Sequence, residues 1–275
     1  MNTWQICEKE CFEYINKKFK CKNFSFTMEG GSDSSKSDIL VIRNGIAIFY
    51  IETKMKKAQC GQFVVFPNEK ERFFIYSKGN KYPENLQSSL IIEKMSKDFD
   101  RYKIPSTKGI KINIDDSFLY DWIYHFYKNN KNVRYFIIEK SVGANNLSDE
   151  NFIIFPVEHF YKYFDIEAFY RKKKSGSSNP TLNDFDDIKQ AISAEGFTIN
   201  KIFQKDKYTY AELDAKKMIY KLTGETNKYQ LKPDGNIFKV TKLSKTSNPN
   251  VIFEISLRKN QDERDLENFK REFQL

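Results

Sequence analysis

Three side chains that could do chemistry lie at one end of an apolar hairpin. Asp38 precedes the first apolar strand, and Glu52 and Lys54 end the second. The dipeptide Asn44-Gly45 between the two runs is a strong hairpin signal. Acids and a lysine have little reason to end such runs unless they meet a ligand. Carboxylate oxygens suit a divalent metal, and together with a lysine they indicate chemistry on a phosphodiester.

The strand register tests whether these groups can share one site. Because side chains alternate between faces, a two-residue turn would place Asp38 and Glu52 on opposite faces of the sheet. A three-residue loop, Arg43-Asn44-Gly45 with a left-handed Gly45, would bring Asp38, Glu52 and Lys54 onto one face. We therefore expect the three-residue loop. Both faces of the hairpin are apolar away from this end, which is typical of a strand pair in the middle of a covered sheet.

These residues carry a resemblance. Asp38 followed after a hairpin by Glu52-Thr53-Lys54 resembles the metal-binding signature of the PD-(D/E)XK nuclease superfamily. The flanking Gly30-Gly31-Ser32 and the segment Gln59-Cys60-Gly61-Gln62-Phe63 resemble bacterial type II restriction endonucleases. Ser37 stands where the superfamily usually has proline, a departure that leaves the liganding groups in place.

The resemblance, which covers residues 5 to 175, implies a Mg²⁺-dependent, sequence-specific endonuclease acting on double-stranded DNA. It implies that Asp38, Glu52 and the backbone carbonyl of Thr53 hold one or two Mg²⁺ ions, and that Lys54 orients the attacking water. In the superfamily a glutamate on the first helix often assists. Glu10 or Glu13 could take that role here, and the sequence does not choose between them.

Further residues are expected to contact DNA. Gln59 and Gln62, three residues apart, would lie on one side of a helical turn beside the site. The run from Tyr170 to Pro180 is the clearest composition shift in the chain, and it could be a linker, a solvated loop or a phosphate clamp. The full set of expected DNA contacts is Lys36, Gln59, Gln62, Arg171, Lys173, Lys174 and Ser175.

Composition narrows the class of protein. The 275 residues include 46 Lys and Arg against 37 Asp and Glu, a net charge of +9 that modestly favours a polyanionic partner. With only two histidines, a His-Asn-His nuclease or a Ser-His-Asp hydrolase is disfavoured. The four cysteines lack paired Cys-x-x-Cys spacing, so we expect reduced thiols rather than structural zinc. No apolar run is long enough for a membrane, and no signal peptide is evident, so we expect a cytoplasmic protein.

The order of expected elements predicts an α/β (α+β) fold in two parts. Residues 1–178 should form the catalytic domain, a mixed central β-sheet sandwiched by helices. Residues 179–275 should form a smaller β-rich C-terminal module, a possible DNA-recognition region. A homodimer is the default if the target is palindromic. Two alternatives remain: a junction resolvase or repair nuclease on the same core, and a non-catalytic DNA-binding protein.

Overall fold

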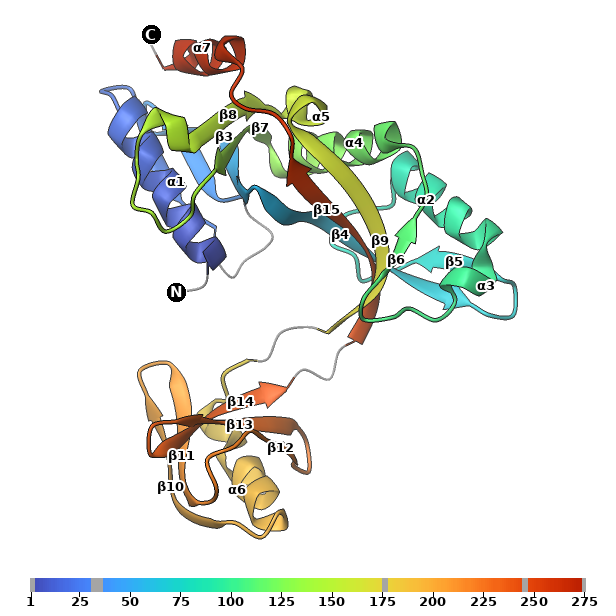
Figure 1. The fold of residues 1–275 in the computed structure, drawn as a ribbon, viewed down its shortest axis with the longest axis vertical. Coiled ribbons are helices and arrows are strands. Elements are labelled where there is room, and N and C mark those ends of the chain that lie inside the picture. The colour runs from blue at the N-terminus through green and yellow to red at the C-terminus, as the bar shows by residue number, and fades with distance from the viewer. Residues whose placement is uncertain (1–2, 31–36, 175–177, 244–246, 274–275) are drawn as a thin grey trace. The chain divides into compact units, whose positions relative to one another are not determined.

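The computed structural model describes residues 3–30, 37–174, 178–243 and 247–273 (Figure 1). The chain forms two compact units, Met1–Arg171 with Pro249–Leu275 (unit 1) and Lys172–Asn248 (unit 2). This division differs from the expected 1–178 and 179–275. The C-terminal segment belongs to unit 1, because its apolar residues Val251, Ile252 and Phe253 are buried in that unit's core.

A mixed five-stranded sheet carries the hairpin singled out above, in the order β1-β2-β3-β7-β8. Strands β1, β2 and β3 are antiparallel, β7 runs parallel to β3, and β8 is antiparallel to β7. The strands are β1 Phe24–Met28, β2 Ile39–Arg43, β3 Ile46–Met55, β7 Val133–Glu139 and β8 Phe152–Pro156.

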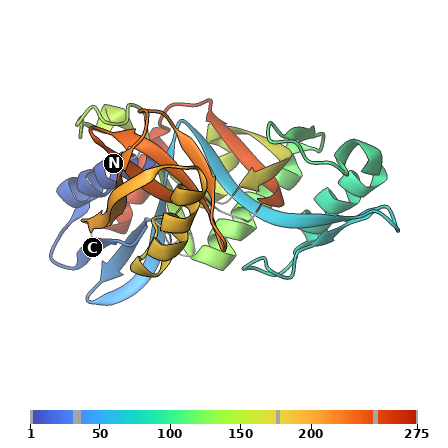
Figure 2. The same cartoon turned by 90° about the horizontal axis from the view of Figure 1, so that it is seen from below.

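A second five-stranded sheet completes unit 1, in the order β5-β4-β15-β9-β6. Strand β3 leads into β4 with only Lys56 between them, and Figure 2 shows this long run crossing the unit. The strands are β4 Lys57–Asn68, β5 Phe73–Tyr76, β6 Ile110–Ile112, β9 Phe164–Lys174 and β15 Ser247–Leu257.

Helices cover both faces of the mixed sheet. Alternate residues of β7 enter different cores: Tyr135 packs with residues of α1 and α7, whereas Phe136 packs with residues of α2 and α4. The expected sandwich is therefore confirmed. The helices of unit 1 are α1 Thr3–Phe19, α2 Leu86–Lys97, α3 Phe99–Tyr102, α4 Asp116–His125 with a π-helical turn Phe126–Asn130, 3₁₀ turns Asp149–Asn151 and Val157–His159, α5 Phe160–Tyr163 and α7 Glu263–Glu272.

Unit 2 is one antiparallel sheet covered by one long helix, with a core of its own. Helix α6 buries Ile188, Ala191 and Ile192 against the sheet, whose strand order is β10-β11-β14-β13-β12. Its elements are a 3₁₀ turn Leu182–Asp184, α6 Phe185–Ala194, β10 Thr198–Lys205, β11 Tyr208–Asp214, β12 Tyr220–Thr223, β13 Lys228–Asp234 and β14 Ile237–Leu243. Among the described residues of both units, no helix is long and apolar enough to span a membrane.

The β2–β3 hairpin closes with a two-residue turn, so the expected three-residue loop is wrong. Asn44 and Gly45 both have positive φ, 51° and 81°, as in the turns that suit strand twist. The register then shifts once, where Ile48 forms a bulge in β3. This extra residue restores the parity, so that Asp38 and Glu52 lie on the same face after all.

Candidate active site

Asp38 is held against the strand that carries the other two candidate groups. Its Oδ2 atom accepts hydrogen bonds from the Thr53 backbone N–H and from the Thr53 hydroxyl, both at 2.8 Å. Only 8% of Asp38 is exposed. Burial and the nearby charge of Glu52 raise the pKa of Asp38 to about 6, against the lowering effect of Lys54. A nearby cation would stabilise the charged form of such a buried carboxylate.

Glu52 and Lys54 form a buried ion pair. The Lys54 ammonium donates to Glu52 Oε1 at 2.5 Å and to the Thr53 carbonyl oxygen at 3.0 Å. Burial alone would raise the pKa of Glu52, but the charges of Lys54 and Lys131 and the contacts with Lys54 and Ser37 together outweigh burial, so the pKa is lowered. The pKa of Lys54 is raised, because the charges of Glu52 and Asp38 outweigh its own burial.

The arrangement fits a hard divalent cation. Asp38, Glu52 and the Thr53 carbonyl offer only oxygen atoms, which Mg²⁺ prefers. Glu52 Oε2 is buried and receives no hydrogen bond of ordinary geometry from the described residues. The Ser37 hydroxyl is nevertheless near enough to help lower the pKa of Glu52. The Lys54 ammonium already contacts two of the oxygens expected to bind the ion. These oxygen atoms therefore stabilise a positive charge placed between them.

The two first-helix glutamates considered from sequence make their contacts away from the candidate site. Glu10 accepts hydrogen bonds from the backbone N–H groups of Gly143 at 2.7 Å and Asn145 at 3.1 Å, so it holds a loop. Glu13 is exposed and pairs with Lys9 at 3.4 Å. Neither contact involves Asp38, Glu52 or Lys54.

Glu8 is the residue that the sequence reasoning missed. Burial and the charge of Asp38 raise its pKa to about 7, with a smaller raising effect from Glu52 and a lowering effect from Lys54. Glu8 therefore lies within the electrostatic field of all three candidate groups. Helical periodicity could have included it, since Glu8, Cys11 and Ile15 are three and four residues apart.

Gln59 and Gln62 do lie together, but on a strand rather than on the expected helical turn. Both belong to β4, and Gln59 Nε2 donates to Gln62 Oε1 at 2.8 Å. Residues three apart on a regular strand point to opposite faces. Here β4 gains one residue relative to β15 between these positions, and Gly61 has a φ of +108°. The bulge brings the two amides to one side.

The described part of the basic run after Tyr170, up to Lys174, continues a strand. Strand β9 continues to Lys174, which includes the backbone of Lys173. Arg171 Nη1 donates to Glu254 Oε1 at 3.3 Å, so part of its charge is already paired. Lys36 and Ser175 lie outside the described residues.

Comparison with known proteins yields one informative match. The chain is similar to a solved structure of HhaI endonuclease in complex with DNA, with 35% sequence identity and a TM-score of 0.80. The match covers 100% of this chain and 100% of that chain. No protein-family model and no curated protein matches this sequence.

The fold is thus a restriction-endonuclease-like mixed sheet between helices, with two acids and a lysine where its central strands end. The chain belongs to the restriction endonuclease family that includes HhaI endonuclease.

Proposed function

We propose that this protein is a Mg²⁺-dependent, sequence-specific endonuclease that hydrolyses phosphodiester bonds of double-stranded DNA. The observation that carries the proposal is that Thr53 links the two parts of the site: its N–H donates to Asp38, and its carbonyl oxygen and Glu52 both accept from the Lys54 ammonium. The solved relative was crystallised with DNA, which supports DNA as the substrate. The net charge of +9 agrees with a polyanionic partner.

The residues would divide the work as follows. Asp38, Glu52 and the Thr53 carbonyl would hold Mg²⁺, which supplies positive charge to the phosphate and makes bound water more acidic. Thr53 fixes the Asp38 carboxylate through two hydrogen bonds. Lys54, charged at neutral pH, would orient the attacking water and stabilise the added negative charge of the transition state. Gln59, Gln62, Arg171, Lys173 and Lys174 would contact the DNA.

Cleavage of both strands of a palindromic site requires two active sites, so we propose a homodimer on DNA. Size-exclusion chromatography with light scattering, with and without a cognate duplex, measures this. A complex containing one protein chain per duplex would contradict the dimer.

The decisive experiment is cleavage of phage DNA by the purified protein. We expect discrete bands with Mg²⁺ and none with a chelator. Asp38→Asn, Glu52→Gln and Lys54→Met should each lower the cleavage rate by about 10³-fold or more, because several kcal/mol of transition-state stabilisation is lost. DNA affinity in the presence of chelator should persist, since none of these changes removes an expected DNA contact.

The matched control is Lys57→Met, which removes an exposed lysine three residues further along the chain. It should cut at the wild-type rate, and unfolding temperatures of all variants show whether each is folded. Unchanged cleavage in any of the three site variants would refute the assignment. Preferential cutting of four-way junctions or single strands, with no discrete bands, would favour a different nuclease on the same core.

A further inference from the structure

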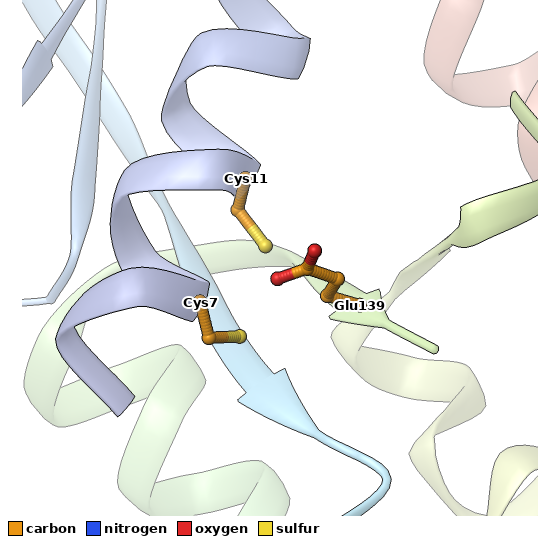
Figure 3. Close-up of side chains that lie close together, drawn as sticks. All are labelled: Cys7, Cys11 and Glu139. Atoms are coloured by element: carbon orange, nitrogen blue, oxygen red, sulfur yellow. The ribbon is translucent and has the colours of Figure 1, made fainter. Parts of the chain in front are cut away.

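Two thiols and a carboxylate outside the proposed magnesium ligands meet beneath the first helix. Cys7 and Cys11 project from α1 toward Glu139 at the end of β7 (Figure 3). Their ligand atoms all lie within 4.8 Å of one another. The three residues are 2%, 0% and 1% exposed. This cluster is therefore a closed site within the core of unit 1.

Regular secondary structure holds all three groups in place. Residues four apart on a helix lie on one face, one turn above the other, which places the Cys7 and Cys11 sulfurs together. Glu139 pairs with Met55 in the parallel β3–β7 ladder. Because parallel partners point to the same face, Glu139 and Met55 share the face that packs on α1. The cluster needs no loop to form it.

One oxygen of the buried Glu139 carboxylate has no hydrogen-bond donor among the described residues. Its Oε1 atom accepts one hydrogen bond, from Asn151 Nδ2 at 3.3 Å, and its buried Oε2 receives none from the described residues. Burial and the adjacent Glu10 carboxylate raise the pKa of Glu139 to about 9. A buried carboxylate with one such oxygen and a second acid beside it is costly to ionise, and a bound cation would stabilise its charged form.

We propose that Cys7, Cys11 and Glu139 bind a thiophilic divalent cation such as Zn²⁺. Two thiolates and one carboxylate supply three of the four positions of a tetrahedral site, and with Zn–S bonds of about 2.3 Å the observed spacing suffices. Thiolate ligands select against Mg²⁺, so this site and the oxygen-lined active site would take different metals. The expectation of reduced thiols agrees with the structure, in which all four cysteines are free of disulfides. The proposal departs from the expectation only in adding a metal ion.

The ion would tie α1 to the end of β7. Glu8 follows Cys7 directly, so the same link would fix the helix that presents Glu8 to the active site. The proposal does not depend on nuclease activity, because metal binding and stability can be measured without DNA.

Cobalt titration of the full-length protein tests the site. The protein, reduced and stripped with a chelator, should bind about one equivalent of Co²⁺ with a thiolate-to-cobalt charge-transfer band, and Zn²⁺ should abolish that band. Oxygen ligands such as Asp38 and Glu52 cannot produce it. Cys7→Ser and Cys11→Ser should each weaken binding at least about tenfold and reduce the band, and Glu139→Gln should weaken binding while both thiolates keep a band.

Two cysteines outside the cluster provide matched controls. Cys21→Ser removes an exposed thiol and Cys60→Ser removes a buried one, and both variants should keep the band and the affinity. Zn²⁺ should raise the unfolding temperature of the wild type by at least about 4 °C and leave the Cys7→Ser/Cys11→Ser protein unchanged. Circular dichroism shows whether each variant is folded.

Three results would overturn the proposal. The wild type could show no charge-transfer band, or the band could survive in the Cys7→Ser/Cys11→Ser protein. Alternatively, Glu139→Gln could stabilise the metal-free protein while Zn²⁺ has no effect on the wild type, which would mean that Glu139 is simply a protonated buried acid. If the cysteine variants fail to fold, the wild-type titration and Glu139→Gln still decide.

Discussion

Glu8 lies in the combined field of three charged residues, although it belongs to a separate helix. Its burial, its raised pKa and its position together suit a group that helps to position a water molecule or a metal-bound water. We expect Glu8→Gln to lower the cleavage rate by about 10²-fold, within the usual range for a lost acid or base, without changing the unfolding temperature. Rates at saturating DNA and thermal melts measure both effects.

Glu13→Gln is the matched control for that prediction. It lies on the same helix, is exposed and pairs only with Lys9 in an i, i+4 contact, which contributes little to stability. Equal rates for Glu8→Gln and the wild type would remove Glu8 from the site. An equal loss in both variants would indicate a general effect on the helix instead.

The sequence predicts that Asp38, Glu52 and Lys54 lie together, but it does not single out Glu8 among the acids of the first helix, for a physical reason. Asp38, Glu52 and Lys54 belong to one hairpin, so local alternation with one extra residue is enough to bring them onto one face. Choosing among Glu8, Glu10 and Glu13 requires the rotation of α1 about its axis. That rotation is set by tertiary packing of Cys11 and Tyr14, which the helical period alone does not fix.

At the scale of elements, two bulges position the site. The bulge at Ile48 restores the face shared by Asp38 and Glu52, and the bulge at Gly61 gathers Gln59 and Gln62. The alternation of side chains between the two faces showed that the hairpin needs one extra residue. It did not show where that residue lies, because the position of a bulge depends on the packing of the neighbouring strands.

The second bulge requires a residue without a Cβ atom at position 61. An added Cβ would lie 2.5 Å from Trp122 Cζ3, and the φ of +108° is strained for other residues. Trp122 is 3% exposed and stacks on Phe126, so it has little room to move. We expect Gly61→Ala to lower the free energy of unfolding by about 3 kcal/mol, measured by urea denaturation.

Gly45→Ala is the control, since Gly45 has a φ of +81° and nothing within 4 Å of its added Cβ. Gly45→Ala should lower the free energy of unfolding by about 1 kcal/mol, because it adds only backbone strain. If the two substitutions cost the same, the contact with Trp122 is not what restricts residue 61.

In unit 2, Asp187 joins helix α6 to the turn between β12 and β13. Its carboxylate accepts hydrogen bonds from Thr226 Oγ1 at 2.8 Å, Asn227 N at 3.0 Å and Tyr229 OH at 2.7 Å. Burial alone would raise its pKa, but the hydrogen bonds from Tyr229 and Thr226 outweigh burial and hold the pKa well below the usual range of an aspartate. The charged form is therefore the one that the fold stabilises.

That lowered pKa fixes the direction of a pH effect. A depressed native pKa contributes stability that is present above the unfolded-state value, about 4, and is lost as the pH falls below it. We expect Asp187→Asn to lower the stability of unit 2 by about 2 kcal/mol at pH 7 and to reduce its acid sensitivity. Thermal melts from pH 7 to pH 3 measure this; parallel curves for variant and wild type would contradict it.

At the scale of the whole molecule, unit 2 interrupts unit 1 between two neighbouring strands. It lies between β9 and β15 in sequence, and these strands are adjacent in the second sheet. The sequence showed a composition shift near residue 175 and β-rich segments after it, which located the start of unit 2 closely. Its end was missed, because β15 resembles the preceding strands and its place in unit 1, between β4 and β9, is set by long-range pairing.

The charge of unit 2 suggests what it contributes to DNA binding. Lys172–Asn248 contains 15 lysines and 9 acidic residues, a net charge of +6, and no arginine. Lysine is a point charge suited to phosphates, whereas arginine makes the commonest bidentate contacts to guanine. We therefore expect unit 2 to supply affinity for the DNA backbone more than base recognition.

Deleting unit 2 tests that expectation. Arg171 and Pro249 can be joined by a short Gly-Ser linker because β9 and β15 are neighbours, and each unit has its own buried core, so unit 1 should remain folded. The deletion should weaken cognate and non-cognate DNA binding alike and reduce the slope of log K against log salt by at least about 2, as phosphate contacts are lost. Fluorescence anisotropy at several salt concentrations measures both quantities, with circular dichroism as the folding check. Loss of cognate binding alone at an unchanged salt slope would instead assign base recognition to unit 2, through its asparagine, glutamine or threonine side chains rather than its lysines.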